Sequence, residues 1–304
     1  MNDILTSRAP VRILDLGGWT DTWFCKSGAV LNFAIDRYSY VKLIPNYKNK
    51  IRIKSENLNI RTEMKDFRNI KYNGNLDLLK AAIKKLQVRE GLDITVKTEV
   101  HPGSGTGTSA SVAVALIHAL SVHLDKPLNT YQTAKLAHKL ETEELHLESG
   151  VQDQFAAAYG GINFMKVDYP EVTLTSLELK DSIIEKINNC ILLVYLNPHS
   201  SSDIHKYVLK NFIEKDKNTL EAFEILRMCP YKMKEALLHG KIEKIPEIMN
   251  LNWNAQKNLH PLVTNNQIKL LEKIVFTHGG LGFKCNGAGG GGSATIFTNE
   301  IHKK

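Results

Sequence analysis

Residues 101–111 read HPGSGTGTSAS, and this stretch decides the fold. An alternating stretch at 93–100 precedes it and predicts a strand, and an apolar stretch at 109–124 follows it and predicts a buried helix. Glycines at every second position let the backbone turn its amides toward a polyphosphate, and the start of a helix adds free N–H groups. The alternative is a tight turn closed by a Ser/Thr helix cap. Three alternating glycines exceed what a cap requires, so we interpret the segment as a phosphate-binding loop.

Two other glycine motifs are excluded. A Walker A loop carries a lysine directly after its last glycine, and no lysine lies between Lys97 and Lys126. The later cluster at 287–292, GAGGGG, has the spacing of a dinucleotide fingerprint, but the strand-like SATIF follows it where that fold needs a helix. The sequence therefore predicts neither a P-loop fold nor a Rossmann fold.

Carboxylates gather in ETEELHLESGVQDQF, residues 141–155. A kinase that acts on a hydroxyl needs a carboxylate near the acceptor and ligands for magnesium, because the metal neutralises charge on the transferred phosphoryl group. Glu141 and Asp153 meet both needs. Two alternatives are that Glu141, Glu143 and Glu144 form a solvated helix face, and that Asp153 is a helix N-cap.

The N-terminal stretch APVRILDLGGWTD, residues 9–21, places Arg12 inside an otherwise apolar strand. Two glycines then expose Trp19, Thr20 and Asp21. An arginine at a strand edge is usually solvated, whereas a buried one needs an anionic partner such as a phosphate.

Composition narrows the class of protein. The chain has 304 residues, of which 43% are hydrophobic and 23% charged, as in soluble globular proteins. It has no apolar run of eighteen residues and no signal-peptide pattern at its start, so we expect a cytoplasmic enzyme without membrane contact. The four cysteines form no CxxC pair, which argues against a zinc site. The net charge of +7 is dispersed, and its densest stretch, 48–54, alternates in a way that is typical of a solvated strand face.

The periodicity predicts a mixed α and β chain. We expect a hairpin of 28–35 and 38–44 turning at Ile35-Asp-Arg-Tyr38, and a domain boundary near residue 180. The other predicted strands are 93–100, 189–195, 282–285 and 293–297. The predicted helices are 76–90, 109–124, 130–145, 220–239, 242–259 and 265–278.

Together the three motif segments resemble the GHMP kinases, the superfamily of galactokinase, homoserine kinase, mevalonate kinase and phosphomevalonate kinase. The first motif is similar to APxRxxxxGxxTD, and it is matched at Ala9, Pro10, Arg12, Gly17, Thr20 and Asp21. The glycine loop at 102–109 resembles the second motif, and GAGGGG at 287–292 resembles the third. Their order and spacing also fit, so the resemblance spans nearly the whole chain.

This resemblance implies a role for each matching position. Asp153 resembles the catalytic aspartate, Arg12 the basic residue beside the transferred phosphate, and Glu141 the magnesium ligand, to which Thr108 or Ser109 adds a hydroxyl. The positions implied to bind ATP are Pro102, Gly103, Ser104, Gly105, Thr106, Gly107, Thr108 and Ser109. Those implied to bind the sugar are Gly18, Trp19, Thr20, Asp21 and Gln152. The implied cofactors are ATP and Mg²⁺.

The implied fold is a two-domain α/β (α+β) kinase. Residues 1–180 would form a domain like ribosomal S5 domain 2, and residues 181–304 a ferredoxin-like domain. Within the superfamily, GGWTD and GVQDQF resemble the heptose 7-phosphate 1-kinases, and a fucokinase-like sugar 1-kinase is the alternative. Such an enzyme binds a small sugar or sugar phosphate, needs no nucleic acid, and is a monomer or a homodimer. A nucleic-acid-binding protein with a decayed kinase site is an alternative of another class, but no basic cluster with interleaved aromatic residues supports it.

Overall fold

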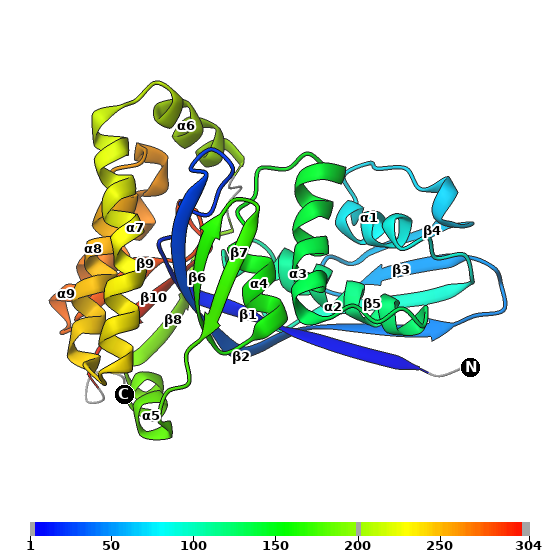
Figure 1. Cartoon of the computed structure of the whole chain (residues 1–304), viewed down its shortest axis with the longest axis horizontal. Coiled ribbons are helices and arrows are strands. Elements are labelled where there is room, and N and C mark those ends of the chain that lie inside the picture. The colour runs from blue at the N-terminus through cyan, green and yellow to red at the C-terminus, as the bar shows by residue number, and fades with distance from the viewer. Residues whose placement is uncertain (1–3, 199–201, 300–304) are drawn as a thin grey trace. The chain divides into compact units, whose positions relative to one another are not determined.

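A computed structural model of the chain describes residues 4–198 and 202–299 and shows a mixed α/β protein (Figure 1). Two compact units build it, and each draws on several stretches of sequence. The first unit comprises Met1–Val11, Ala34–Pro102 and Gly107–Gly160. The second unit comprises Arg12–Phe33, Gly103–Thr106 and Gly161–Lys304. The strands β1 (Leu5–Leu16) and β2 (Ser27–Pro45) pair with each other and contribute residues to both units.

The first unit is a sheet with helices packed on one side. Its strands run in the order β4 (Ile60–Met64), β3 (Ile51–Ser55), β5 (Leu92–Thr98) and the second half of β2. Its helices are α1 (Asp77–Lys85), α2 (Thr108–His123), α3 (Thr130–Lys139) and α4 (Gln152–Tyr159). Short helical turns lie at Phe67–Asn69 and, in π form, at Leu140–Glu144. Alternate strand residues such as Ile51 and Ile53 are buried against α1 and α2, which leaves the other face of the sheet to solvent.

The second unit contains two groups of strands. The first half of β2 pairs with β6 (Ile162–Asp168), which pairs with β7 (Glu171–Ser176). A separate sheet has the order β8 (Ile191–Tyr195), β10 (Ser293–Phe297), β9 (Gly282–Cys285). The helices are α5 (Asp181–Cys190), α6 (Ser202–Ile213), α7 (Lys217–Leu238), α8 (Ile245–Lys257) and α9 (Asn266–Thr277), with short turns at Ile242–Lys244 and Pro261–Val263. Their core includes Phe223, Trp253 and Phe283, and the last two rings meet edge to face at 5.9 Å.

The predicted hairpin is wrong, because β2 is one strand of 19 residues. Residues 27–33 pair with β6, and residues 39–45 pair with β5. The polar Asp36 and Arg37 that suggested a turn lie between these two pairings, where both are exposed. A strand that changes partner along its length therefore needs no turn at this point.

Other elements agree with the sequence patterns to within a few residues. The strands predicted at 282–285 and 293–297 are confirmed at both ends. The helix predicted at 130–145 is α3 followed by the π turn at Leu140–Glu144. The compact units are made of interleaved stretches of sequence, so they do not test a boundary between two consecutive domains. The boundary near residue 180 therefore stays a prediction. Among the residues that the structure describes, no helix is both long and apolar enough to cross a membrane.

Candidate active site

The glycine loop has an alternating backbone conformation. Gly103, Gly105 and Gly107 have φ angles of +75°, +71° and +71°, a region that other residues rarely adopt. Gly107 is also the N-terminal cap of α2, which begins at Thr108. Alternation between left-handed and ordinary conformations makes successive peptide N–H groups converge, as in anion-binding nests.

The carbonyl groups of residues 104–106 accept hydrogen bonds from other residues of the second unit. The Ser293 hydroxyl donates to the Ser104 carbonyl at 2.7 Å, and the Arg12 N–H donates to the Thr106 carbonyl at 3.0 Å. The Arg12 guanidinium donates to the Gly105 carbonyl between them. Because a trans peptide points its C=O and N–H in opposite directions, the N–H groups that follow these carbonyls point away from Ser293 and Arg12. The loop is therefore built to present N–H groups to an anion.

The second glycine cluster packs directly against this loop. A Cβ added to Gly105 would lie 2.7 Å from the Asn286 carbonyl oxygen, and one added to Gly292 would lie 2.7 Å from the backbone of Ser104. Real Cβ atoms do not make contacts this short. The GAGGGG segment thus braces the phosphate loop, and it does not form a nucleotide fingerprint of its own.

A buried charge cluster lies beside the same loop. Arg12 is 4% exposed, so the alternative of a solvated strand-edge arginine is wrong. Its guanidinium lies 3.9 Å from the Asp15 carboxylate, which accepts from the Lys284 amine at 3.1 Å and from the Gly287 N–H at 3.1 Å. The Lys284 amine also donates to the Cys285 carbonyl at 2.8 Å. Burial lowers the pKa of Lys284, and the Asp15 carboxylate opposes that change.

The GGWTD stretch forms a buried turn in the second unit. Trp19, Thr20 and Asp21 are 5%, 0% and 1% exposed. The Thr20 hydroxyl donates to the carbonyls of Gly17 and Ala29 at 2.8 and 3.0 Å, which fixes the turn to β2. The Trp19 indole packs on the His205 ring, 4.5 Å between centroids, and its buried Nε1–H finds no acceptor within the described residues. A buried donor without a partner is costly, so this N–H fits a ligand oxygen.

Glu141 is buried in the first unit, so it is not part of a solvated helix face. It lies in the π turn after α3 and is 8% exposed, whereas Glu143 is exposed. The Ser149 hydroxyl and the Gln154 amide both donate to its Oε2 at 2.7 Å. Burial raises the pKa of Glu141 to about 7, and the nearby Asp153 charge adds to that rise, while the two hydrogen bonds oppose it.

Asp153 is not a helix N-cap. α4 begins at Gln152 after Val151, and no side chain caps it, so the half-buried Asp153 lies in its first turn. Gln152 beside it is 7% exposed. These residues and Glu141 belong to the first unit, whereas Arg12 and the GGWTD turn belong to the second.

The residues expected to hold magnesium fit that ion. Both donors to Glu141 use Oε2, and no hydrogen bond to Oε1 forms in the described part of the chain. The Gln154 Oε1 nearby is buried and accepts no hydrogen bond among the same residues. Residues 4–198 and 202–299 contain no group of three or more His, Cys, Asp or Glu side chains that would form an all-protein metal cage. Mg²⁺ typically uses one or two carboxylates and completes its shell with water and phosphate oxygens.

Several structural residues of this site escaped the sequence interpretation. They are Asp15, Lys284 and Asn286 around the loop, with Ser149 and Gln154 around Glu141. Asn286 accepts from the Leu14 N–H at 2.9 Å and donates to Ser293 at 2.9 Å, so it ties β1 to the residue that supports the loop. Asp15 lies two residues before Gly17, and Lys284 lies three residues before Gly287. Nothing in the sequence separates them from ordinary surface charges, and only the structure shows that both side chains are buried.

A glycine-rich loop whose N–H groups converge is typical of proteins that bind phosphate groups. Residues 76–161 match the family described as GHMP kinases N terminal domain. A D-glycero-alpha-D-manno-heptose 7-phosphate kinase of Campylobacter jejuni is 29% identical over 309 residues, covering 98% of this chain and 91% of that one. A bifunctional fucokinase/GDP-fucose pyrophosphorylase of Arabidopsis thaliana is 25% identical over 97% of this chain and 30% of its own length. The crystal structure of a D-glycero-D-manno-heptose 1-phosphate kinase from Bacteroides thetaiotaomicron has a TM-score of 0.80 at 23% identity, covering 99% of this chain and 90% of that one.

Residues 76–161 thus match the N-terminal domain of the GHMP kinases, and the chain is similar to a sugar phosphate kinase along 98% of its length. It is a kinase that transfers a phosphate group to a hydroxyl, and ATP is the phosphate donor throughout this family. The α/β kinase fold predicted from the three motifs is confirmed.

Proposed function

We propose that this kinase phosphorylates the anomeric hydroxyl of a sugar, and that its sugar is D-glycero-D-manno-heptose 7-phosphate. The observation that supports a sugar acceptor is the buried GGWTD turn, where the Trp19 N–H has no acceptor among the described residues. The heptose is supported by the 29% identical heptose 7-phosphate kinase, which aligns along 98% of this chain. A fucokinase-like activity is the alternative, supported by the relative that carries a fucokinase.

Each motif residue has a proposed role in the transfer. The acceptor oxygen attacks the γ-phosphorus while its proton passes to the Asp153 carboxylate, and the bond from phosphorus to the leaving oxygen of ADP breaks. Loop N–H groups of Gly103 to Ser109 bind the phosphates of ATP, and Arg12 stabilises negative charge on the transferred group. Asp21 and Gln152 orient sugar hydroxyls.

Magnesium is proposed to bind at Glu141 with a hydroxyl from Thr108 or Ser109. When bound, the ion neutralises charge on the β- and γ-phosphates. The contribution of the chain is the orientation of the Glu141 carboxylate, which Ser149 and Gln154 fix by holding Oε2. Thr108 is the first residue of α2 and Ser109 is exposed beside it, so both stand at the end of the loop.

The phosphate already on the substrate needs a cationic partner. Lys26 and Arg37 follow the sugar motif in sequence, and both are exposed. Lys26 belongs to the same unit as the GGWTD turn, five residues after Asp21, and adopts a φ of +61°. We therefore assign the substrate phosphate to Lys26 first and to Arg37 second.

A coupled ATPase screen tests the proposal. It compares heptose 7-phosphate, the same heptose without its phosphate, fucose and galactose. We expect kcat/KM for heptose 7-phosphate to exceed that for the unphosphorylated heptose, and Lys26→Ala to narrow this gap, whereas Lys48→Ala at an exposed turn leaves it unchanged. If fucose or the unphosphorylated heptose is the better substrate by about tenfold, roughly 1.4 kcal/mol of transition-state stabilisation, the fucokinase-like alternative replaces the heptose phosphate.

A further inference from the structure

The exposed face of the first unit's sheet carries a row of cations. Pairing registers place Arg61 of β4 opposite Lys54 of β3, Lys54 opposite Thr95 of β5, and Thr95 opposite Lys42 of β2. Side chains in register on neighbouring strands lie on the same face. Three cations and one hydroxyl therefore form a line across four strands, which we call the cationic row.

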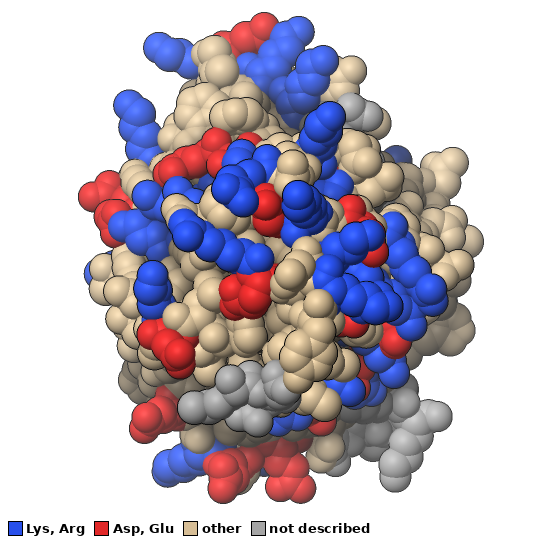
Figure 2. All heavy atoms as spheres, turned by 90° about the vertical axis from the view of Figure 1, so that its right-hand side faces the viewer, with Lys and Arg blue, Asp and Glu red and all other residues tan. Residues whose placement is uncertain are grey.

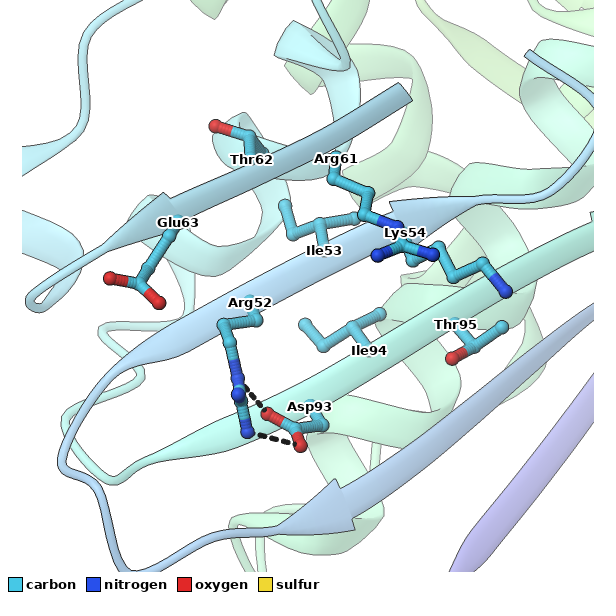
Figure 3. Close-up of a pocket in the computed structure, with 9 residues that line it drawn as sticks. All are labelled: Arg52, Ile53, Lys54, Arg61, Thr62, Glu63, Asp93, Ile94 and Thr95. Carbon is cyan, nitrogen blue, oxygen red and sulfur yellow. Dashed lines mark hydrogen bonds and ion pairs between the residues drawn. The ribbon is translucent and has the colours of Figure 1, made fainter. Parts of the chain in front are cut away.

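Arg61, Lys54 and Thr95 of the cationic row line a groove of about 500 Å³, whereas Lys42 is not among its lining residues (Figure 3). Its walls include Arg52, Lys54, Arg61, Glu63, Asp93 and Thr95. In the close-up, the side chains of Arg61 and Lys54 extend side by side from adjacent strands, and Arg52 turns away from them toward Asp93. A groove of this size is within the range of small-molecule sites, which hold roughly 300–1,000 Å³.

Arg52, which lies beside the cationic row, is paired with a carboxylate, whereas the cations of the row are weakly paired or form no ion pair among the described residues. Arg52 donates two hydrogen bonds to Asp93 at 2.7 and 2.6 Å. Lys54 has one carboxylate near it, Glu56 at 3.3 Å, and both partners of that pair are about 40% exposed, so the pair is weak. Arg61 and Lys42 form no ion pair within residues 4–198 and 202–299.

Two like charges directly opposite each other on a sheet are destabilising. Arg61 and Lys54 are such a pair, and adjacent strands are about 4.8 Å apart. A phosphate group bound between them would accept hydrogen bonds from both and convert the repulsion into attraction, and the Thr95 hydroxyl follows Lys54 in the same row. Arginine and lysine are the usual partners of phosphate oxygens.

We propose that the cationic row binds a small molecule that carries a phosphate or pyrophosphate group. On one side of the row, the adjacent row on the same face contains Glu63 and Asp93. On the other side, Glu56 lies 3.3 Å from Lys54, and Lys97 adds one cation two residues after Thr95. Figure 2 views the side on which the β3 and β4 ends lie in Figure 1, and there Lys and Arg gather in patches with Asp and Glu between them. A long polyanion would meet carboxylates on either side of the row, so the surface favours a compact phosphate ligand over a nucleic acid.

This site is separate from the phosphate loop. None of its residues belongs to the three kinase motifs, and all lie in the first unit's sheet between residues 42 and 95. Its existence does not depend on the identity of the kinase substrate.

Calorimetric titration of the full chain carrying Gly105→Ala with inorganic pyrophosphate tests the proposal, because that substitution weakens phosphate binding at the glycine loop and leaves the cationic row intact. We expect one binding event that Arg61→Glu and Lys54→Glu each weaken at least tenfold, and that the milder Arg61→Gln weakens less. Lys48→Glu, a charge reversal at an exposed residue outside the row, is the matched control and leaves the affinity unchanged. Circular dichroism of each variant verifies its fold.

Two results would overturn the proposal. One is the absence of pyrophosphate binding, including the case in which a twelve-nucleotide single-stranded RNA binds instead. The other is pyrophosphate binding that survives Arg61→Glu and Lys54→Glu at full affinity.

Discussion

Glu141 makes the stability of the metal-free protein depend on pH in an unusual direction. Its carboxyl group is buried, and burial raises its pKa from an ordinary value of 4.5 to about 7. No Lys or Arg forms an ion pair with it among the described residues. Between these two values the native state binds more protons than the unfolded state, so the free energy of unfolding falls as pH rises through the window from 4.5 to about 7.

The size of the effect follows from the same pKa. Each unit of pKa difference corresponds to about 1.36 kcal/mol, so the buried carboxylate costs about 3 kcal/mol once it is ionised above pH 7. Below pH 4.5 the group is protonated in both states and the cost is absent. Glu141→Gln keeps the shape and removes the charge, so this variant should gain about 3 kcal/mol relative to the wild type between pH 4.5 and pH 8.

Urea unfolding in EDTA, followed from pH 4.5 to 8, measures this gain. Glu143→Gln is the matched control, since Glu143 is exposed two residues away and its loss should leave the pH dependence unchanged. Adding Mg²⁺ at pH 8 should stabilise the wild type more than Glu141→Gln, because an ion at Glu141 compensates the buried charge. If the wild type and Glu141→Gln have parallel pH profiles, Glu141 is not the buried carboxylate that the structure describes.

Three further predictions concern catalysis and the loop. Asp153→Asn should lower kcat by about 10² or more with little change in ATP affinity, since general bases contribute about 10²–10⁴, and near wild-type turnover would remove Asp153 from the mechanism. Lys284→Met leaves Asp15 buried with one cation fewer, so the free energy of unfolding in urea should fall by about 3 kcal/mol. Adding Asp15→Asn to the same chain should restore part of that loss. A loss below about 0.5 kcal/mol would contradict the pairing of Lys284 with Asp15. Gly105 has a φ of +71° and lies against the Asn286 carbonyl, so Gly105→Ala should weaken ATP binding, measured by calorimetry, at least tenfold. Gly74→Ala is the control, because a Cβ added there meets no atom within 4 Å and should leave ATP binding unchanged. Equal ATP affinities of the two variants would contradict the bracing of the loop.

The sequence predicted the glycine loop and the strand and helix that flank it because their signal is local. Alternating glycines, the strand before them and the apolar helix after them all lie within about thirty residues, and local spacing determines their conformation. The close packing of the later GAGGGG segment against this loop depends on the same residue type, since only glycines permit backbones to approach so closely. The 76–161 region that contains the loop is also the region that matches the kinase family.

The sequence misplaced β2 for the opposite reason. Whether Ile35 to Tyr38 turn or continue as a strand depends on β5 and β6, whose pairing residues lie about 50 and 130 positions further along the chain. Glu141 posed a similar problem. Three glutamates within four residues are typical of a solvated helix, and only the π turn at Leu140–Glu144 and the contacts to Ser149 and Gln154 show that the first of them is buried.

The buried charges beside the loop connect the first motif with the third in a way that neither sequence segment reveals. Asp15 and Lys284 are 269 positions apart, yet their side chains form one buried ion pair, and Arg12 lies at the edge of the same cluster. Ions buried in such a region are costly unless they are compensated, and here compensation comes from distant parts of the sequence. The Asp15 carboxylate accepts from Lys284 and from the Gly287 N–H, and the Arg12 guanidinium donates to the Gly105 carbonyl. The same charges that stabilise one another therefore also hold the first motif, the glycine loop and the third motif together.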